Sequence, residues 1–207
     1  MRAAPRVNSR RRFPPRKGFA RLPAGRRNAL IYRVEEAFSA AECDGIVALR
    51  AEARVRAAPV WGGAGYVEDP RVRQASTCYR ERDAETAWLF DRLDALFAQA
   101  GVALDCPVAP LAEPVQVIRY DLGGHYQAWH TDAGADLDRE RRISVSVELS
   151  GPEEHEGGDL VVAPDGMGGR EGLPRGGARF FLSRSLHRVV PVTRGVRHAL
   201  VAWAPAG

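Results

Sequence analysis

The sequence predicts a mainly β protein, a jelly roll with helices packed outside it. Short apolar segments separated by Gly, Pro and Asp turns fill the chain after Pro114. No helical periodicity interrupts them, whereas two segments of helical period come before them. Closely spaced strands without intervening helices are typical of a sandwich or jelly roll, in which two sheets enclose one core. A chain of 207 residues is long enough for one such domain.

A first helix is expected shortly after the chain becomes globular in composition. Ser39 and Glu42 have the S-x-x-E spacing of a capping box, in which each residue satisfies a backbone N–H of the other. The apolar residues that follow predict a helix that continues toward Val55. Residues 59–70 contain a proline and a glycine cluster, and they predict a loop.

A second helix is expected over residues 84–100. Asp83 is placed to cap its start, and Gly101 is placed to end it. Large apolar residues recur at helical spacing along this segment, so that one face of the helix can pack against the sheet.

Eight strands are expected, and most of them lie in the C-terminal half. They span residues 71–80, 115–120, 125–130, 142–149, 159–163, 178–183, 187–192 and 196–203. The strand at 142–149 alternates four aliphatic residues with Ser144, Ser146 and Glu148. Because side chains alternate along a strand, the small polar set shares one face. That face lines either a wet cavity or the solvent.

The positive charge of the chain is concentrated at its N-terminus. The chain has 30 Lys and Arg against 26 Asp and Glu, and residues 1–27 hold ten of the basic residues and no acidic one. The rest of the chain therefore has 20 basic against 26 acidic residues, a net charge of −6. Residues 1–28 are expected to be a basic disordered tail. The tail is either an unstructured leader or mis-set start, or a segment that binds nucleic acid through counterion release.

Residues 29–207 are expected to form the domain, with helical support in 29–110 and the jelly-roll core in 111–207. The three cysteines are widely spaced and fit neither a disulfide framework nor a C-x-x-C metal site. No apolar run approaches the ~20 residues that span a bilayer, and no apolar region follows the basic N-terminus as in a signal peptide. A cytoplasmic protein without membrane contact is therefore expected.

His130 and Asp132 form an H-x-D triplet at the end of the segment VQVIRYDLGGHYQAWHTD. Residues two apart on extended backbone project from the same face, so both side chains can hold one ion. His187 follows far enough downstream for the chain to make several strands and return beside them. Two imidazoles and one carboxylate form the facial triad of non-haem Fe(II) centres, which leaves coordination positions open. These three residues are the expected metal ligands.

Arg197 is expected to project toward the same site. If residues 193–195 form a turn, His187 pairs with Val201 across a hairpin, and Arg197 then lies on the His187 side. A guanidinium there can hold the far carboxylate of a short dicarboxylate whose near end chelates the metal.

The other histidines fit the expected centre poorly. His125 has the opposite strand parity to His130, and His155 lies in the acidic turn GPEEHEGG, where solvation is expected. His198 is adjacent to Arg197 and should face away from it.

Together these segments resemble the 2-oxoglutarate/Fe(II)-dependent oxygenases, and within them the prolyl-4-hydroxylase-like branch. The likeness covers residues 31–205 in outline and is densest from Val115 to Trp203. It rests on VQVIRYDLGGHYQAWHTD, on RRISVSVELSGPEEHEGGDLVV and on LPRGGARFFLSRSLHRVVPVTRGVRHALVAW. The resemblance implies a double-stranded β-helix, the cupin-like jelly roll, with Fe(2+) bound by His130, Asp132 and His187.

The resemblance also implies how a co-substrate is held. Arg197, ten residues after the second ligand His, would bind the distal carboxylate of 2-oxoglutarate. Tyr120 matches a tyrosine that hydrogen-bonds the co-substrate, and Trp203 matches an aromatic residue near the metal. A buried Tyr and a core Trp are the alternative interpretations. The implied reaction consumes O2 and 2-oxoglutarate, hydroxylates a C–H bond of a peptidyl, amino-acid or small-molecule substrate, and releases succinate and CO2. The resemblance allows ascorbate as a reductant.

Two positions depart from the family pattern, and other functions stay open. Ala199 stands where many relatives have Ser, and Glu148 stands where several hydroxylases have an aromatic residue, so a cationic substrate group is expected near this acid.

The basic tail suggests a nucleic-acid demethylase, but those enzymes carry a second Arg at the position of Trp203. A nucleic-acid-binding protein with an inert barrel, and a metalloprotein that does not use 2-oxoglutarate, are the remaining alternatives. Substrate and oligomeric state are not readable from the sequence.

Overall fold

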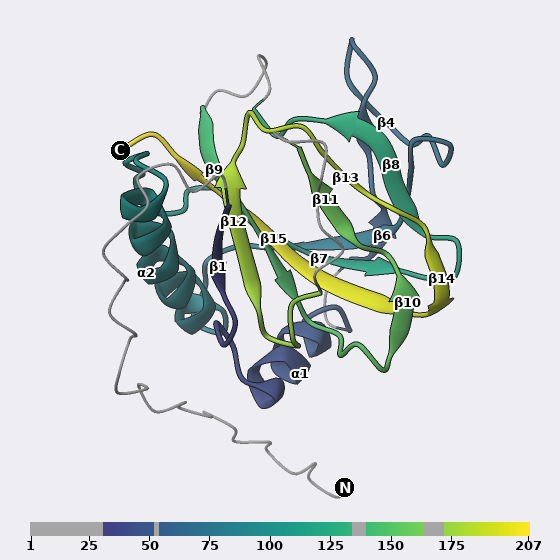
Figure 1. Ribbon diagram of the computed structural model, residues 1–207, viewed down its shortest axis with the longest axis horizontal. Helices are drawn as coiled ribbons and strands as arrows, with labels where there is room; N and C mark the ends of the chain where they lie inside the picture. The colour runs from purple at the N-terminus through teal and green to yellow at the C-terminus, as the bar shows by residue number, and fades with distance from the viewer. Residues whose placement is uncertain (1–30, 52–53, 134–139, 164–171) are drawn as a thin grey trace, which may run out of the picture.

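The computed structural model describes residues 31–51, 54–133, 140–163 and 172–207. The expected basic tail, residues 1–28, lies outside the described residues. Within them, two β-sheets face each other and two helices cover the outer side of the larger sheet (Figure 1). This arrangement is the expected jelly roll, a double-stranded β-helix with flanking helices.

The larger sheet has seven strands, all of them antiparallel to their neighbours. Across the sheet they are β1 (Ile31–Val34), β12 (Ala178–Leu182), β9 (Arg141–Glu148), β15 (Arg197–Pro205), β7 (Val115–Tyr120), β6 (Ser76–Arg80) and β2 (Arg56–Ala57). Three of these strands, β1, β2 and β6, come from the N-terminal part of the domain, residues 29–110, which was expected to give helical support. Strands from both parts of the domain therefore build the sheet.

The smaller sheet has four strands, and two short ribbons accompany it. In order it contains β11 (Leu160–Val162), β13 (His187–Val189), β8 (His125–His130) and β5 (Arg73–Gln74), while β10 (His155–Gly157) pairs with β14 (Val192–Gly195) and β3 (Val60–Trp61) pairs with β4 (Tyr66–Val67). The β3–β4 hairpin lies inside the segment that was expected to be a loop. Gly62 donates its N–H to the Gly65 carbonyl at 2.8 Å, and Gly63 between them has a positive φ of 90° that glycine adopts without strain.

Helix α1 (Ala40–Ala48) begins as expected but ends early. Ser39 Oγ accepts a hydrogen bond from the Glu42 N–H, and the Glu42 carboxylate accepts one from the Ser39 N–H at 2.7 Å, which completes the capping box. The helix has its C-cap at Leu49, so the expected continuation toward Val55 is wrong. Val55 does not belong to a helix, because the next residue, Arg56, already lies in the larger sheet.

Helix α2 (Ala87–Ala103) is displaced by three residues from its expected position. Thr86 is the N-cap, and Asp83 instead accepts the Glu85 and Thr86 N–H groups in the turn before it, at 2.8 and 2.9 Å. Gly101 lies inside the helix, where an added Cβ would come within 3.0 Å of the Cys106 carbonyl oxygen. The prediction that Gly101 ends the helix is wrong, because the glycine allows this close approach of the following chain.

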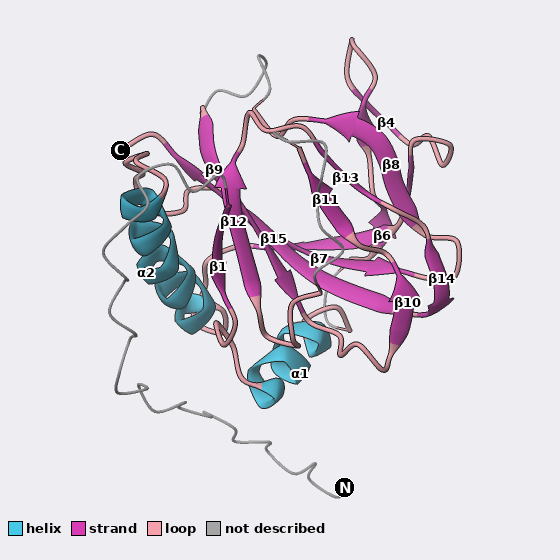
Figure 2. Cartoon of the chain, viewed as in Figure 1, coloured by secondary structure: helices cyan, strands magenta, loops and turns pink. Residues whose placement is uncertain are grey.

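The two helices lie on one side of the larger sheet (Figure 2). On that side the sheet packs into an apolar core, and its other side lines a pocket between the sheets. The helix-facing core contains buried residues from α2 and from alternate positions of the strands, including Leu89, Leu93, Phe97, Val115, Val117, Ile143, Val147, Phe180 and Leu200. The intervening residues Ser144, Ser146 and Glu148 of β9 face the other way, and Ser144 and Ser146 are buried. The polar face of this strand therefore lines a cavity between the sheets.

The expected hairpin between His187 and Val201 is wrong. His187 lies in β13 of the smaller sheet, whereas Val201 lies in β15 of the larger sheet and pairs with Gln116 and Ser146. The chain crosses between the two sheets after β13, and the intervening β14 pairs with β10 instead. The register that was expected from a turn at residues 193–195 is therefore not formed.

Two general expectations concern the cysteines and the membrane. Cys43, Cys78 and Cys106 are free and buried, and burial raises the pKa of the Cys43 thiol to about 11. Among the described residues, no helix has the length and apolar character to cross a membrane.

Candidate metal centre

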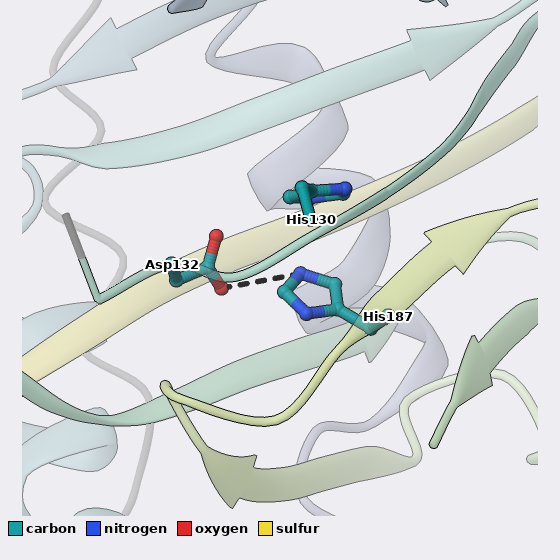
Figure 3. Close-up of side chains that lie close together, drawn as sticks. All are labelled: His130, Asp132 and His187. Atoms are coloured by element: carbon teal, nitrogen blue, oxygen red, sulfur yellow. Dashed lines mark ion pairs between the residues drawn. The ribbon is translucent and has the colours of Figure 1, made fainter.

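His130, Asp132 and His187 converge at one end of the smaller sheet (Figure 3). His130 is the last residue of β8 and His187 the first of β13, and the two are partners in the antiparallel ladder. Asp132 follows β8, where its N–H donates to the Ser183 carbonyl at 2.9 Å. One ligand atom from each residue lies within 4.8 Å of the others, so the three side chains can share one cation.

Backbone carbonyls orient both imidazoles. His130 Nδ1 lies 3.0 Å from the Ala128 carbonyl oxygen, and His187 Nδ1 lies 3.0 Å from that of Ser185. A carbonyl accepts only from a protonated nitrogen, so we assign the proton of each neutral ring to Nδ1. The Nε2 lone pairs are then available, as in many histidine-ligated metal sites.

A pair of serines holds the carboxylate of Asp132. Ser144 Oγ donates to Asp132 Oδ2 at 2.7 Å and lies 2.9 Å from Ser183 Oγ. Asp132 Oδ2 is also 3.4 Å from His187 Nε2. Ser144 and Ser183 are both buried, so their hydroxyls form a fixed outer layer behind the ligand oxygen.

In the metal-free site the electrostatics keep two of the three ligands, His130 and Asp132, in the charge states that a cation needs, whereas His187 is held toward its protonated form by Asp132. Burial, with some help from His187, lowers the pKa of His130 to about 4, so this ring is neutral at physiological pH. Burial opposes ionisation of Asp132, but the two imidazoles and Ser144 outweigh it and lower its pKa. Burial would also lower the pKa of His187, but the Asp132 carboxylate reverses the shift and raises it.

The donor set fits a non-haem Fe(II) ion. Two imidazole nitrogens and one carboxylate oxygen are the facial-triad ligands, and they leave positions for further oxygen donors. The oriented Nε2 atoms and the serine-bound carboxylate meet the requirement that ligands be held by outer hydrogen bonds. Among the described residues, this is the one group of three metal-binding side chains so arranged.

The centre opens into a pocket between the two sheets. Arg197, Tyr120 and Trp203 all line this pocket together with His130, Asp132 and His187. Tyr120 is buried, with the Arg197 guanidinium 5.4 Å from its ring centroid. Trp203 is also buried, and the Arg141 guanidinium stacks 3.7 Å from its ring. The structure thus places all six expected site residues around one cavity, although the hairpin used to locate Arg197 does not exist.

Arg197 is already paired with a carboxylate. Its Nε donates to Glu148 Oε2 at 2.9 Å and its Nη2 to Glu148 Oε1 at 2.5 Å, a bidentate contact with the Arg197 side chain only 2% exposed. Burial disfavours the charged guanidinium, but Glu148 outweighs this and raises the pKa of Arg197. An internal cation therefore already occupies the Glu148 carboxylate in this structure, and the expectation that Glu148 favours a cationic substrate group stays a prediction.

The remaining histidines lie apart from the centre. His125 is buried at the opposite end of β8. His155 is half-buried in β10 with Nδ1 3.0 Å from the Gly157 carbonyl, so the expectation of a solvated turn residue is wrong. His198 is not among the residues that line the pocket, as its adjacency to Arg197 predicted.

The sequence did not reveal the roles of four residues at the site. Three of them, Tyr126, Arg73 and Gln116, line the pocket, and Ser144 hydrogen-bonds the ligand Asp132. Tyr126 stacks on His130 with ring centroids 3.6 Å apart, and the Arg73 guanidinium lies 5.0 Å from the centroid of the Tyr126 ring. The parity of residues 126 and 130 could have identified Tyr126, because side chains four apart on a strand share a face. The contribution of Arg73 depends on β5 pairing with β8, which leaves no local signal.

A double-stranded β-helix with two histidines and one aspartate between its sheets is the framework of the non-haem Fe(II) oxygenases. Residues 115–205 match the family model of the 2OG-Fe(II) oxygenase superfamily. The resemblance that the sequence shows to the 2-oxoglutarate/Fe(II)-dependent oxygenases is confirmed by this match. With the prolyl 4-hydroxylases among the solved structures described below, the chain shares the fold.

The relatives that match this chain include several described as PKHD-type hydroxylases. The one from a Synechococcus species is 36% identical over 97 residues, covering 45% of this chain and 43% of the relative. The one from Hyphomonas neptunium is 41% identical over 91 residues, covering 41% of this chain and 40% of the relative. The alignment therefore spans less than half the length of these curated relatives.

Solved structures extend the likeness of fold to most of the chain. A prolyl-4-hydroxylase from Pseudomonas putida superimposes with a TM-score of 0.67 at 19% identity, covering 86% of this chain and 93% of that one. The viral collagen prolyl hydroxylase of Paramecium Bursaria Chlorella virus-1 gives 0.64 at 19% identity, covering 86% and 97%. At this identity the comparisons establish the fold alone.

Proposed function

We propose that this protein is an Fe(II)- and 2-oxoglutarate-dependent dioxygenase that hydroxylates a C–H bond of a peptidyl, amino-acid or small-molecule substrate. The reaction releases succinate and CO2, and ascorbate serves as a reductant that keeps the iron reduced. His130, Asp132 and His187 bind the iron, and Arg197 binds the distal end of the co-substrate.

One observation carries this proposal: the three ligand side chains and Arg197 line a single pocket between the sheets. A metal ion held by the three ligands and a guanidinium that lines the same pocket match a dicarboxylate that chelates with its 2-oxo acid end. The PKHD-type hydroxylases at 36% and 41% identity support the same class of reaction.

The residues of the chain bind and orient the reactants. A bound Fe(II) ion would supply the oxidative chemistry with O2. Ser144 and the two backbone carbonyls hold the ligands in place, so that little reorganisation is needed when the ion binds. Aromatic and aliphatic residues of both sheets, among them Tyr120, Phe181 and Val189, line the remaining walls and limit water around the centre.

The direct test is iron binding followed by coupled turnover. Protein loaded with Fe(II) without oxygen is exposed to O2, 2-oxoglutarate and a panel of peptides, amino acids and metabolites, and succinate is measured. Asp132→Ala is expected to abolish iron binding and succinate formation together, because one of three ligands is lost. Asp121→Ala removes an exposed carboxylate paired with Arg119 and is the matched control. An unchanged rate of succinate formation in Asp132→Ala would rule out the assignment.

A further inference from the structure

We infer that Glu148 is an internal carboxylate that competes with 2-oxoglutarate for Arg197 and so sets the affinity and selectivity for the co-substrate. This inference rests on the proposed function, since it concerns the co-substrate end of the same pocket. Arg197 is the expected partner of the distal carboxylate, yet both nitrogens of its Nε/Nη2 edge already donate to Glu148, and Nη2 also belongs to the other edge of the guanidinium. A distal carboxylate that arrives at this edge must displace Glu148 or share the guanidinium with it.

The guanidinium is held in one place, so it cannot serve two carboxylates by moving. Arg197 lies on β15 between β7 and β9, and its guanidinium packs against the ring of Tyr120 at 5.4 Å. Its side chain also contacts Gly158, where an added Cβ would come within 3.0 Å of the Arg197 Cδ. Glu148 is the more mobile partner by position, because it is the last residue of β9 and its side chain is 14% exposed against 2% for Arg197.

The surroundings offer the displaced carboxylate a second cation. Glu148 and Arg197 also line an adjacent cavity, which contains Arg179 on the neighbouring strand β12. Burial lowers the pKa of Arg179, and the charge of Glu148 is the largest influence that opposes this shift. Glu148 therefore already lies within electrostatic reach of Arg179, and it can turn toward that guanidinium when a co-substrate takes Arg197.

This arrangement has a consequence for the choice of co-substrate. An Arg197 with its charge unmatched would strongly favour a 2-oxo acid with a distal carboxylate over one with an apolar tail. An Arg197 that is already paired with Glu148 favours the distal carboxylate less. Part of the binding free energy from the new contact is offset, because the Arg197–Glu148 pair is lost. Glu148 is thus a specificity-determining residue that weakens 2-oxoglutarate binding and reduces the preference for 2-oxoglutarate over 2-oxo acids that lack a distal carboxylate.

The test measures binding rather than turnover. Full-length protein is loaded with Mn(II), a redox-inactive stand-in for iron, and calorimetry follows 2-oxoglutarate and 2-oxopentanoate, which has a methyl group in place of the distal carboxylate. In Glu148→Gln the dissociation constant of 2-oxoglutarate is expected to fall about 10- to 100-fold, the range of one charge-assisted contact. The constant for 2-oxopentanoate is expected to stay unchanged. Glu156→Gln removes a carboxylate that pairs with Arg194 on the exposed surface, and it should change neither constant.

A second variant and a thermal unfolding experiment keep the inference testable if Glu148→Gln destabilises the protein. Glu148→Asp keeps the charge but shortens its reach, so an intermediate affinity is expected. Because Glu148→Gln leaves a buried guanidinium without its counter-ion, 2-oxoglutarate should raise the melting temperature of this variant more than that of the wild type. Equal 2-oxoglutarate affinity in wild type and both variants would overturn the role of Glu148 alone. Failure of every Mn(II)-loaded protein to bind 2-oxoglutarate would overturn that role and the co-substrate assignment together.

Discussion

The two faces of the seven-stranded sheet use the same strands for different purposes. On the helix-facing side, Val147 of β9 and Leu200 of β15 belong to an apolar core that α1 and α2 close off. On the inner side, Glu148 and Arg197 come from those same two strands and form a buried ion pair. Because side chains alternate along a strand, every second residue is committed to packing and the others are left for binding and chemistry. Stability and function should therefore respond to different substitutions in the same strands.

The largest expected effect lies on the helix-facing side. Leu93 in the middle of α2 is fully buried, and Leu93→Ala should lower the free energy of unfolding by about 2–5 kcal/mol through lost contacts and a residual cavity. Urea unfolding measures this change, and the folded variant should bind metal with unchanged affinity. Val102→Ala, on the same helix at a side chain 73% exposed, should change stability by less than about 0.5 kcal/mol. A loss of metal affinity in folded Leu93→Ala would show that the two faces are coupled.

A smaller effect is expected on the inner side at Ser144. Ser144→Ala removes the hydroxyl that donates to Asp132 Oδ2, and metal affinity should fall about 10- to 100-fold, as for other losses of outer hydrogen bonds. Calorimetry with Mn(II) measures it. The complementary control is Ser39→Ala, which removes the cap of α1 and should cost about 1 kcal/mol of stability with no change in metal binding. If Ser39→Ala weakens metal binding as much as Ser144→Ala does, metal binding does not depend on the inner face alone.

The smallest effect concerns a titrating residue of the larger sheet. Burial, followed by the positive charges of Arg50 and Arg119, lowers the pKa of His198 from 6.5 to about 4. Between these two values the unfolded chain takes up a proton that the folded protein excludes, so the free energy of unfolding should decrease as the pH falls from 6.5 to 4. His198→Asn should reduce this slope in urea unfolding of the metal-free protein. An identical slope in variant and wild type would contradict the shift.

The parts that were predictable from the sequence depend on local patterns. Strands β7 and β8 have the expected bounds, because apolar periodicity and the intervening glycines both delimit them. The alternation in β9 predicted two distinct faces but not which environment the polar one meets. The start of α1 was predictable because a capping box is a contact between near neighbours in the chain.

The errors arose where distant segments decide the outcome. The end of α2 was misplaced because Gly101 is tolerated for its packing against Cys106, a contact outside the helix pattern. The His187–Val201 hairpin was wrong because nothing near the turn shows that the chain changes sheets there. The partner of Arg197 was missed because Glu148 reaches it only through the register of β9 against β15.

The pairing of His130 with His187 across β8 and β13 also bears on the order of assembly. The two histidines are far apart along the chain, so the loop between them must close before their rings can meet. A nascent or partly folded chain presents single imidazoles and a lone carboxylate, which hold a cation only weakly. Metal loading should therefore come last in maturation, and a loaded ion would lock the smaller sheet against opening.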